Sequence, residues 1–214
     1  MRSAQGRQLR LQCGGGSHWR DHNCQALRAP GIRAGSMGDR WGQLRMCLGS
    51  LAGLPEPQVP PGLVLRTFRS DDEAGWAQLM TGAIGDWDVQ STRREFLGDL
   101  GVDPDGIFFL VMGGEYVATA TDKRTADAAT GYLQHMVAVS AAHRGRRLGR
   151  CVSLAALRHM RQRGCQRAVL DTDDDRLPAI RTYLALGFVP HMVEDDHPAR
   201  WQRVMSHLEH AASR

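Results

Sequence analysis

The pattern of apolar and polar residues becomes regular after about residue 62. The stretch "LVLRTFRS" (63–70) alternates between the two kinds and predicts a strand. In "SDDEAGWAQLMTGAIG" (70–85), Ser70 and Glu73 have the spacing of a capping box, and apolar residues follow at helical spacing. "TRREFLGDLG" (92–101) predicts a second, short helix that ends at Gly101.

Strands and helices are expected to alternate in the rest of the chain. Two apolar runs around Gly113 and Gly114 predict a β-hairpin over 107–124, and "GYLQHMVAVS" (131–140) predicts one further strand. A helix is expected over 148–163, a strand over 167–173, and a helix over 177–187 with Pro178 near its start. "FVPHM" (188–192) and "RWQRVMSHL" (200–208) are expected to be the last strands.

This order predicts one α/β domain over residues 62–209, with about seven strands and four helices. The strand–helix–strand unit over 131–173 should place two parallel strands side by side.

Residues 1–61 show no such pattern. Glycine, arginine and polar residues dominate, and "LPEPQVPPG" (54–62) brings four prolines, so we expect a disordered leader followed by a Pro-rich linker. The leader could also be a transit peptide or could reflect a misassigned start, with Met37 or Met46 as the true first residue. No continuous apolar segment follows the basic residues, which argues against a signal peptide.

Composition excludes several classes of protein. No apolar run approaches the ~20 residues of a membrane span, so no membrane partner is expected. The net charge of +4 and arginines without interleaved aromatic residues support no nucleic-acid role. Five cysteines without paired spacing suggest a reducing cytosol, and a single lysine beside 26 arginines suggests a GC-rich coding sequence, so we expect a cytoplasmic, bacterial protein.

The leader also contains residue types that bind zinc. Their spacing matches no common zinc finger and three glycines lie within it, so no metal is expected. The residues concerned are Cys13, His18, His22 and Cys24.

The clearest chemical signal is "RGRRLGR" (144–150), a basic, glycine-containing loop directly before a helix. A helix N-terminus presents unpaired N–H groups and the positive end of the helix dipole, and arginines add bidentate phosphate donors. The stretch is therefore built like a diphosphate cradle; the alternative is a solvated basic turn.

This loop resembles motif A of the GNAT superfamily of N-acetyltransferases, whose pattern is Gln/Arg-x-x-Gly-x-Gly/Ala. The match lies at Arg144 and Gly149, and Arg147 stands where the family has its first glycine. Since the site needs only a backbone N–H at that position, the Arg147 side chain must point away from the phosphates.

A second stretch resembles motif B of the same family, with the right order and separation from the first. The residues that fit are Ala179, Tyr183, Leu186, Gly187 and Phe188, and Arg176 replaces the family's asparagine. The resemblance implies a GNAT-like fold, with a central, mostly antiparallel sheet that contains a splayed parallel pair.

The resemblance also implies an enzyme that moves an acetyl group from acetyl-CoA, as co-substrate, to an amine through a tetrahedral intermediate. Tyr183 would protonate the leaving thiolate, and the backbone near Val137 would pair with the pantetheine arm and stabilise the oxyanion. The implied coenzyme-binding residues are Val137, Ala138, Val139, Arg144, Gly145, Arg146, Arg147, Leu148, Gly149, Arg150 and Arg176.

The base that deprotonates the amine is less well marked. His135 matches a position where some family members carry a catalytic histidine, although it could equally be a histidine that only lines the cleft. Glu115 is a weaker candidate, and "EDDH" (194–197) could select a cationic acceptor or form a solvated turn. Trp76, Trp87 and Trp201 could line a pocket or fill the core.

Two functions stay open at this point. One is acetyl transfer to a small-molecule or peptide amine of unknown identity. The other is a catalytically inactive CoA-binding module of the same fold with a regulatory or interaction role. The sequence leaves monomer and homodimer equally open.

Overall fold

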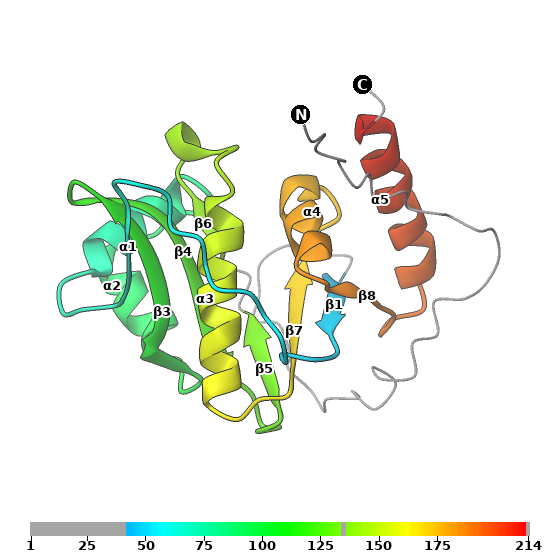
Figure 1. Cartoon of the computed structure of the whole chain (residues 1–214), viewed down its shortest axis with the longest axis horizontal. Helices are drawn as coiled ribbons and strands as arrows, with labels where there is room; N and C mark the ends of the chain where they lie inside the picture. Colours follow the sequence, from blue (N-terminus) through cyan, green and yellow to red (C-terminus); the bar gives the residue numbers. More distant parts are fainter. Residues whose placement is uncertain (1–41, 134–135, 213–214) are drawn as a thin grey trace, which may run out of the picture.

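The structure is a computed structural model that describes residues 42–133 and 136–212 (Figure 1). These residues form an eight-stranded mixed sheet with helices packed against it. Its order is β2-β3-β4-β5-β7-β1-β8, with β6 also beside β4; β5 and β7 run parallel and the other pairs antiparallel. This confirms the predicted α/β fold and its parallel pair. The strands are β1 (Leu44–Leu48), β2 (Val64–Thr67), β3 (Val102–Met112), β4 (Glu115–Arg124), β5 (Thr130–Leu133), β6 (Ala138–Val139), β7 (Arg167–Thr172) and β8 (Val189–His191).

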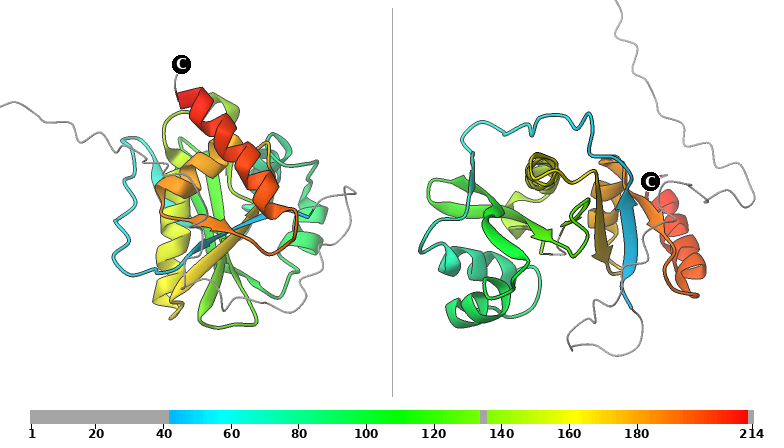
Figure 2. Two further views of the ribbon diagram at one scale, coloured as in Figure 1. Left: turned by 90° about the vertical axis from the view of Figure 1, so that its right-hand side faces the viewer. Right: turned by 90° about the horizontal axis from the view of Figure 1, so that it is seen from below.

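Helices cover both faces of this sheet. α1 and α2 lie on one face and α3 on the other, while α4 and α5 lie beside β7, β1 and β8 (Figure 2). No helix in the described ranges is both long and apolar enough to cross a bilayer. The helices are α1 (Glu73–Thr81), α2 (Val89–Ser91), the π-helical turn Thr92–Phe96, the 3-10 turn Ala141–His143, α3 (Leu148–Gln162), α4 (Leu177–Ala185) and α5 (His197–Ala212).

The helix α3 forms where the sequence predicts it. Its apolar residues recur at helical spacing and are buried against β3 and β4, and Gly164, with a φ of 93°, lets the chain leave the helix end. β4 also contacts α1, so it is covered on both faces, and its residues 117–122 are all buried although three of them are polar.

The predicted start of the folded domain at residue 62 is wrong, because β1 lies within the sheet. Leu44 and Met46 are fully buried, and the strand pairs with β7 on one side and β8 on the other. The segment after β1 then passes over α3 to reach β2, held by hydrogen bonds from Arg158 to Leu54 O (3.0 Å) and from Leu51 N to Gln166 O (2.8 Å) (Figure 2). Residues 1–41, including the possible zinc ligands, lie outside the described residues.

The predicted final strand over 200–208 is also wrong, because this stretch belongs to α5. Trp201, Val204 and Leu208 are buried at intervals of three and four residues, which is the period of a helix. The Arg200 guanidinium fixes the start of this helix. It donates hydrogen bonds to the Asp174 carboxylate, the shortest at 2.5 Å, and to the Gly42 carbonyl at 2.6 Å.

Smaller differences concern the ends of elements. The predicted strand over 131–140 is split: β5 pairs with β4 and β7, whereas β6 pairs with β4. Ser70 does not cap α1, which begins at Glu73; the capping box belongs instead to α2, where Asp88 and Ser91 bond reciprocally. The short helix expected over 92–101 is the π-helical turn that ends at Phe96.

Candidate active site

The split between β5 and β6 opens the sheet on one side. β5 pairs with β7 only up to Tyr132, and within the described residues β6 pairs with β4 alone. The two halves of the sheet therefore separate beyond this point, and a cleft of about 710 Å3 lies between them. Its wall includes the backbone of β6, which is free on the side facing the cleft to pair with an extended ligand.

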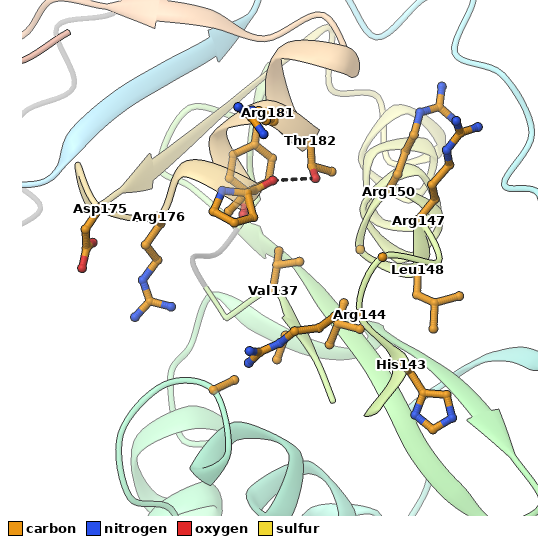
Figure 3. A pocket seen from close by; sticks show the side chains of 18 residues that line it. Val137, His143, Arg144, Arg147, Leu148, Arg150, Asp175, Arg176, Arg181 and Thr182 are labelled. Carbon is orange, nitrogen blue, oxygen red and sulfur yellow. Dashed lines mark hydrogen bonds between the residues drawn. The ribbon is translucent and has the colours of Figure 1, made fainter. Parts of the chain in front are cut away.

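The basic loop and the start of α3 form one end of the cleft (Figure 3). Gly145 and Arg147 have positive φ angles of 78° and 60°, and no side chain caps the helix. A Cβ at Gly149 would meet only Val139, at 3.5 Å, so the space at the helix start stays open. The N–H groups of the first turn are thus available to an anion in the cleft.

Tyr183 forms part of the wall opposite β6. It lies on α4, is 5% exposed, and packs edge-on against Phe188, which follows the turn at Gly187. Burial raises the pKa of the Tyr183 phenol, while the nearby positive charge of Arg176 opposes part of this rise. The hydroxyl is therefore a neutral hydrogen-bond donor at physiological pH.

The mouth of the cleft carries mainly positive charge. Arg144 and Arg176 point into the same space from opposite sides of the cleft (Figure 3), with the exposed Asp175 beside Arg176. Arg176 also forms an ion pair with Asp173 at 3.2 Å, which holds its side chain near the start of α4. This charge favours a polyanionic ligand.

Most of the sequence-predicted coenzyme residues line this cleft, although Arg146 does not. His135 lies outside the described residues, so its predicted role stays a prediction. Those that line the cleft are Val137, Ala138, Val139, Arg144, Gly145, Arg147, Leu148, Gly149, Arg150, Arg176 and Tyr183.

The weaker sequence candidates lie elsewhere. Glu115 lines a separate hollow of about 450 Å3 between α1 and the β3–β4 hairpin. In the "EDDH" stretch, Asp196 pairs with Arg200 and His197 is fully buried at the start of α5, so these two stabilise the helix. Trp76 and Trp201 are buried in the core, and Trp87 packs edge-on against Trp76.

Several lining residues had no role in the sequence prediction. His143 is 8% exposed, and its Nδ1 lies 2.8 Å from the Ser140 hydroxyl. Thr182, next to Tyr183 on α4, also lines the cleft, as does Ala179 one turn before Tyr183, which the motif B resemblance had already marked. Ala83 comes from the far side of the sheet, and local sequence holds no signal for its position.

The comparisons with known proteins agree with this geometry. The model of the acetyltransferase (GNAT) family matches residues 68–188. A mycothiol acetyltransferase from Streptomyces bingchenggensis is 33% identical over 87% of this chain and 61% of its own length. Another from Thermobispora bispora is 33% identical over 66% of this chain and 51% of its own.

Solved structures of other proteins share this fold. A GCN5-related N-acetyltransferase from Sphaerobacter thermophilus superposes with a TM-score of 0.55 at 22% identity, over 71% of this chain and 50% of that one. The chain thus spans only half to three-fifths of the length of these proteins. The family match covers more than half of the chain, so this protein belongs to the GNAT family of acetyltransferases.

Proposed function

We propose that this chain transfers the acetyl group of acetyl-CoA to the amine of a small polar molecule. One observation carries the proposal: a single cleft unites a backbone edge free for pairing, an uncapped helix start with arginines, and a buried neutral tyrosine. These groups fit the three parts of acetyl-CoA, namely the pantetheine amides, the phosphates and the thioester.

Each group would have a separate task. The backbone of Val137 to Val139 would hold the pantetheine arm as an added strand and present an N–H to the developing oxyanion. The N–H groups from Gly145 to Gly149 would hold the diphosphate. In this arrangement the amine would attack the thioester carbon directly, without a covalent enzyme intermediate.

Tyr183 would donate a proton to the departing thiolate. Since burial keeps its phenol protonated, the hydroxyl carries a proton throughout the physiological range. Because a thiolate is a weaker base than this phenolate, Tyr183 would first donate a hydrogen bond to the departing sulfur, and after proton transfer its phenolate would regain a proton from solvent. The proton that the attacking amine loses would go to a separate base.

Few side chains in the cleft could accept the proton that the amine loses. Of the described residues that line the cleft, His143 and Asp175 have the chemistry of a base, and His143 is already bonded to Ser140. Asp175 is exposed at the cleft mouth, where a water could connect it to an arriving amine. His135, which precedes β6, stays the third candidate.

The acceptor is proposed from the relatives. Several curated relatives are named mycothiol acetyltransferase, so a mycothiol-related amine is the first acceptor to test. The polyamines are expected to be poor acceptors, because Arg144 and Arg176 at the cleft mouth repel polycations.

The test is an acetyl-CoA-dependent transfer assay on the full chain, with acetylated product detected by mass spectrometry. The panel contains a mycothiol-related amine, amino acids, aminoglycosides, polyamines and peptides. Tyr183→Phe should fold normally and lower kcat by about 10²- to 10⁴-fold, the usual effect of losing a general acid. Binding of acetyl-CoA without transfer to any amine would support the inactive CoA-binding module instead.

A further inference from the structure

Three consecutive aspartates lie in the loop that joins β7 to α4, and their side chains go to three different places. Asp173 pairs with Arg176 of the same loop at 3.2 Å. Asp174 pairs with Arg200 on α5, whereas Asp175 lines the cleft. Neighbouring carboxylates repel each other, so their separation depends on the cations that bind the first two. We call residues 173–176 the aspartate loop.

Arg200 reaches the aspartate loop from outside the cleft. Its side chain is 8% exposed, and it donates hydrogen bonds to both carboxylate oxygens of Asp174, from Nη2 at 2.5 Å and from Nε at 3.1 Å. Its Nη1 donates to the Gly42 carbonyl at 2.6 Å and lies 3.4 Å from Asp196. Among the described residues of α5, none lines the cleft. Arg200 can therefore affect the cleft only through the loop that it holds.

Arg176, the arginine of the aspartate loop itself, is held less firmly. It lines the cleft and points into the same space as Arg144 (Figure 3). Within the described residues its ion-pair partner is Asp173, and the two side chains are 40% and 47% exposed. Ion pairs as exposed as this one are weak. The Arg176 side chain can therefore change partner when another carboxylate becomes available nearby.

Asp174 is the nearest such carboxylate in the sequence. Its hydrogen bond from Arg200 holds the pKa of Asp174 below its usual value, so the group is ionised at neutral pH. While Arg200 neutralises this charge, it attracts Arg176 little. Without Arg200, the free carboxylate would draw Arg176 toward α5 and away from the cleft.

We propose, resting on acetyl-CoA as donor, that Arg200 is a positioning residue for coenzyme binding. By occupying Asp174 it leaves the Arg176 side chain turned into the cleft, where an anionic ligand can meet it. The role belongs to α5, a helix that itself contributes no described residue to the cleft wall.

The test is isothermal titration of the full chain with acetyl-CoA at low salt, with the Tm of each variant measured in parallel. Arg200→Ala should weaken binding about 3- to 10-fold, because the ligand loses a partly exposed charged partner, and it should also lower Tm. The double variant Arg200→Ala/Asp174→Asn should regain most of the affinity, since no free carboxylate then competes for Arg176. Its Tm should stay low, because α5 and the loop remain unlinked. A purely structural role for Arg200 would not restore affinity without stability.

Three further variants sharpen the test. Arg203→Ala is the matched control, because it removes the same charge from an exposed position on the same helix, close enough to Asp174 to influence its pKa. It should leave the affinity within about twofold of the wild type. Arg200→Lys keeps the charge beside Asp174 and should bind acetyl-CoA almost as well as the wild type. Arg200→Gln removes the charge but keeps a donor for the Gly42 carbonyl, so it should repeat the loss of affinity even if Arg200→Ala does not fold.

The outcomes separate this inference from the proposed function. Wild-type affinity in the folded Arg200→Ala or Arg200→Gln variant would overturn the positioning role. An affinity that stays low in the double variant would also overturn it, and would leave Arg200 with a structural role alone. Failure of the wild type to bind acetyl-CoA would contradict the proposed function itself, and this inference with it.

Discussion

A buried ion cluster joins β4 to the last turn of α3, and its removal should destabilise the domain strongly. The Asp122 side chain is fully buried, and it accepts hydrogen bonds from Arg163 Nε at 2.8 Å and Nη2 at 2.6 Å. The Nδ1 atom of His159 lies 2.8 Å from the same carboxylate. Both partners are about one-fifth exposed, with side-chain values of 21% and 19%.

The magnitude follows from this geometry. Breaking a fully buried ion pair by removing one partner costs about 3–5 kcal/mol, because the other charge loses its compensation. Since Arg163 and His159 still reach water at their edges, we expect Asp122→Ala to cost about 3 kcal/mol, at the lower end of that range. Asp122→Asn keeps the shape and some hydrogen bonds, so its cost should be about half as large.

The assay is thermal unfolding followed by circular dichroism at neutral pH. At about 2–4 °C per kcal/mol for a domain of this size, Asp122→Ala should lower Tm by roughly 6–12 °C. The matched control is Asp103→Ala, which removes a largely exposed pair with Arg124 and should cost about 0–1 kcal/mol. The cluster lies about 20 Å along α3 from the basic loop 144–150, so acetyl-CoA affinity should not change in the folded variant.

A Tm of Asp122→Ala within a degree or two of the wild type would contradict this prediction. A loss of stability in the Asp103 control as large as that of the buried variant would contradict it equally. Either result would mean that hydration of the partners, rather than their burial, decides the energetics of the cluster.

Three other predictions concern stability. A hydrogen bond from Arg200 holds the pKa of Asp174 below its usual value. The ionised carboxylate therefore stabilises the fold at every pH above its unfolded pKa of about 4, and this stabilisation is lost as the pH falls through the lower pKa of the folded state. Asp174→Asn should accordingly lower Tm at pH 7, and the difference from the wild type should disappear in acid. In Gly75→Ala the new Cβ would lie 2.1 Å from the Tyr116 ring, so the free energy of unfolding in urea should fall by about 1–3 kcal/mol. An unchanged urea midpoint would contradict this close packing. A chain begun at Met46 lacks two residues of β1 and should melt well below the full chain, whereas equal stability would show that this strand is dispensable.

The features with strong local signals could be predicted from the sequence. The helix α3 has a clear period and a glycine stop, and the β3–β4 hairpin has two glycines between apolar runs. The sequence also indicated that residues of the basic loop 144–150 and Tyr183 share a site, because each belongs to a motif with fixed spacing, and both line the cleft. All of these depend on residues that are close together in the chain.

The features that were missed depend on distant partners or on weak patterns. The strand β1 has only five residues, and its place between β7 and β8 is fixed by contacts more than a hundred residues away. The helical period of α5 was present at Trp201, Val204 and Leu208, but the aromatic and β-branched residues favoured a strand reading. The position of Ala83 in the cleft wall follows from packing across the sheet, which no local pattern encodes.

Calorimetric titration of the full chain with acetyl-CoA tests most directly whether the start of α3 and its arginines bind coenzyme A. We expect saturable 1:1 binding in the range of about 1 µM to 1 mM that covers most enzyme substrates, with affinity that falls as salt concentration rises. The absence of any binding at millimolar acetyl-CoA and low salt would contradict it.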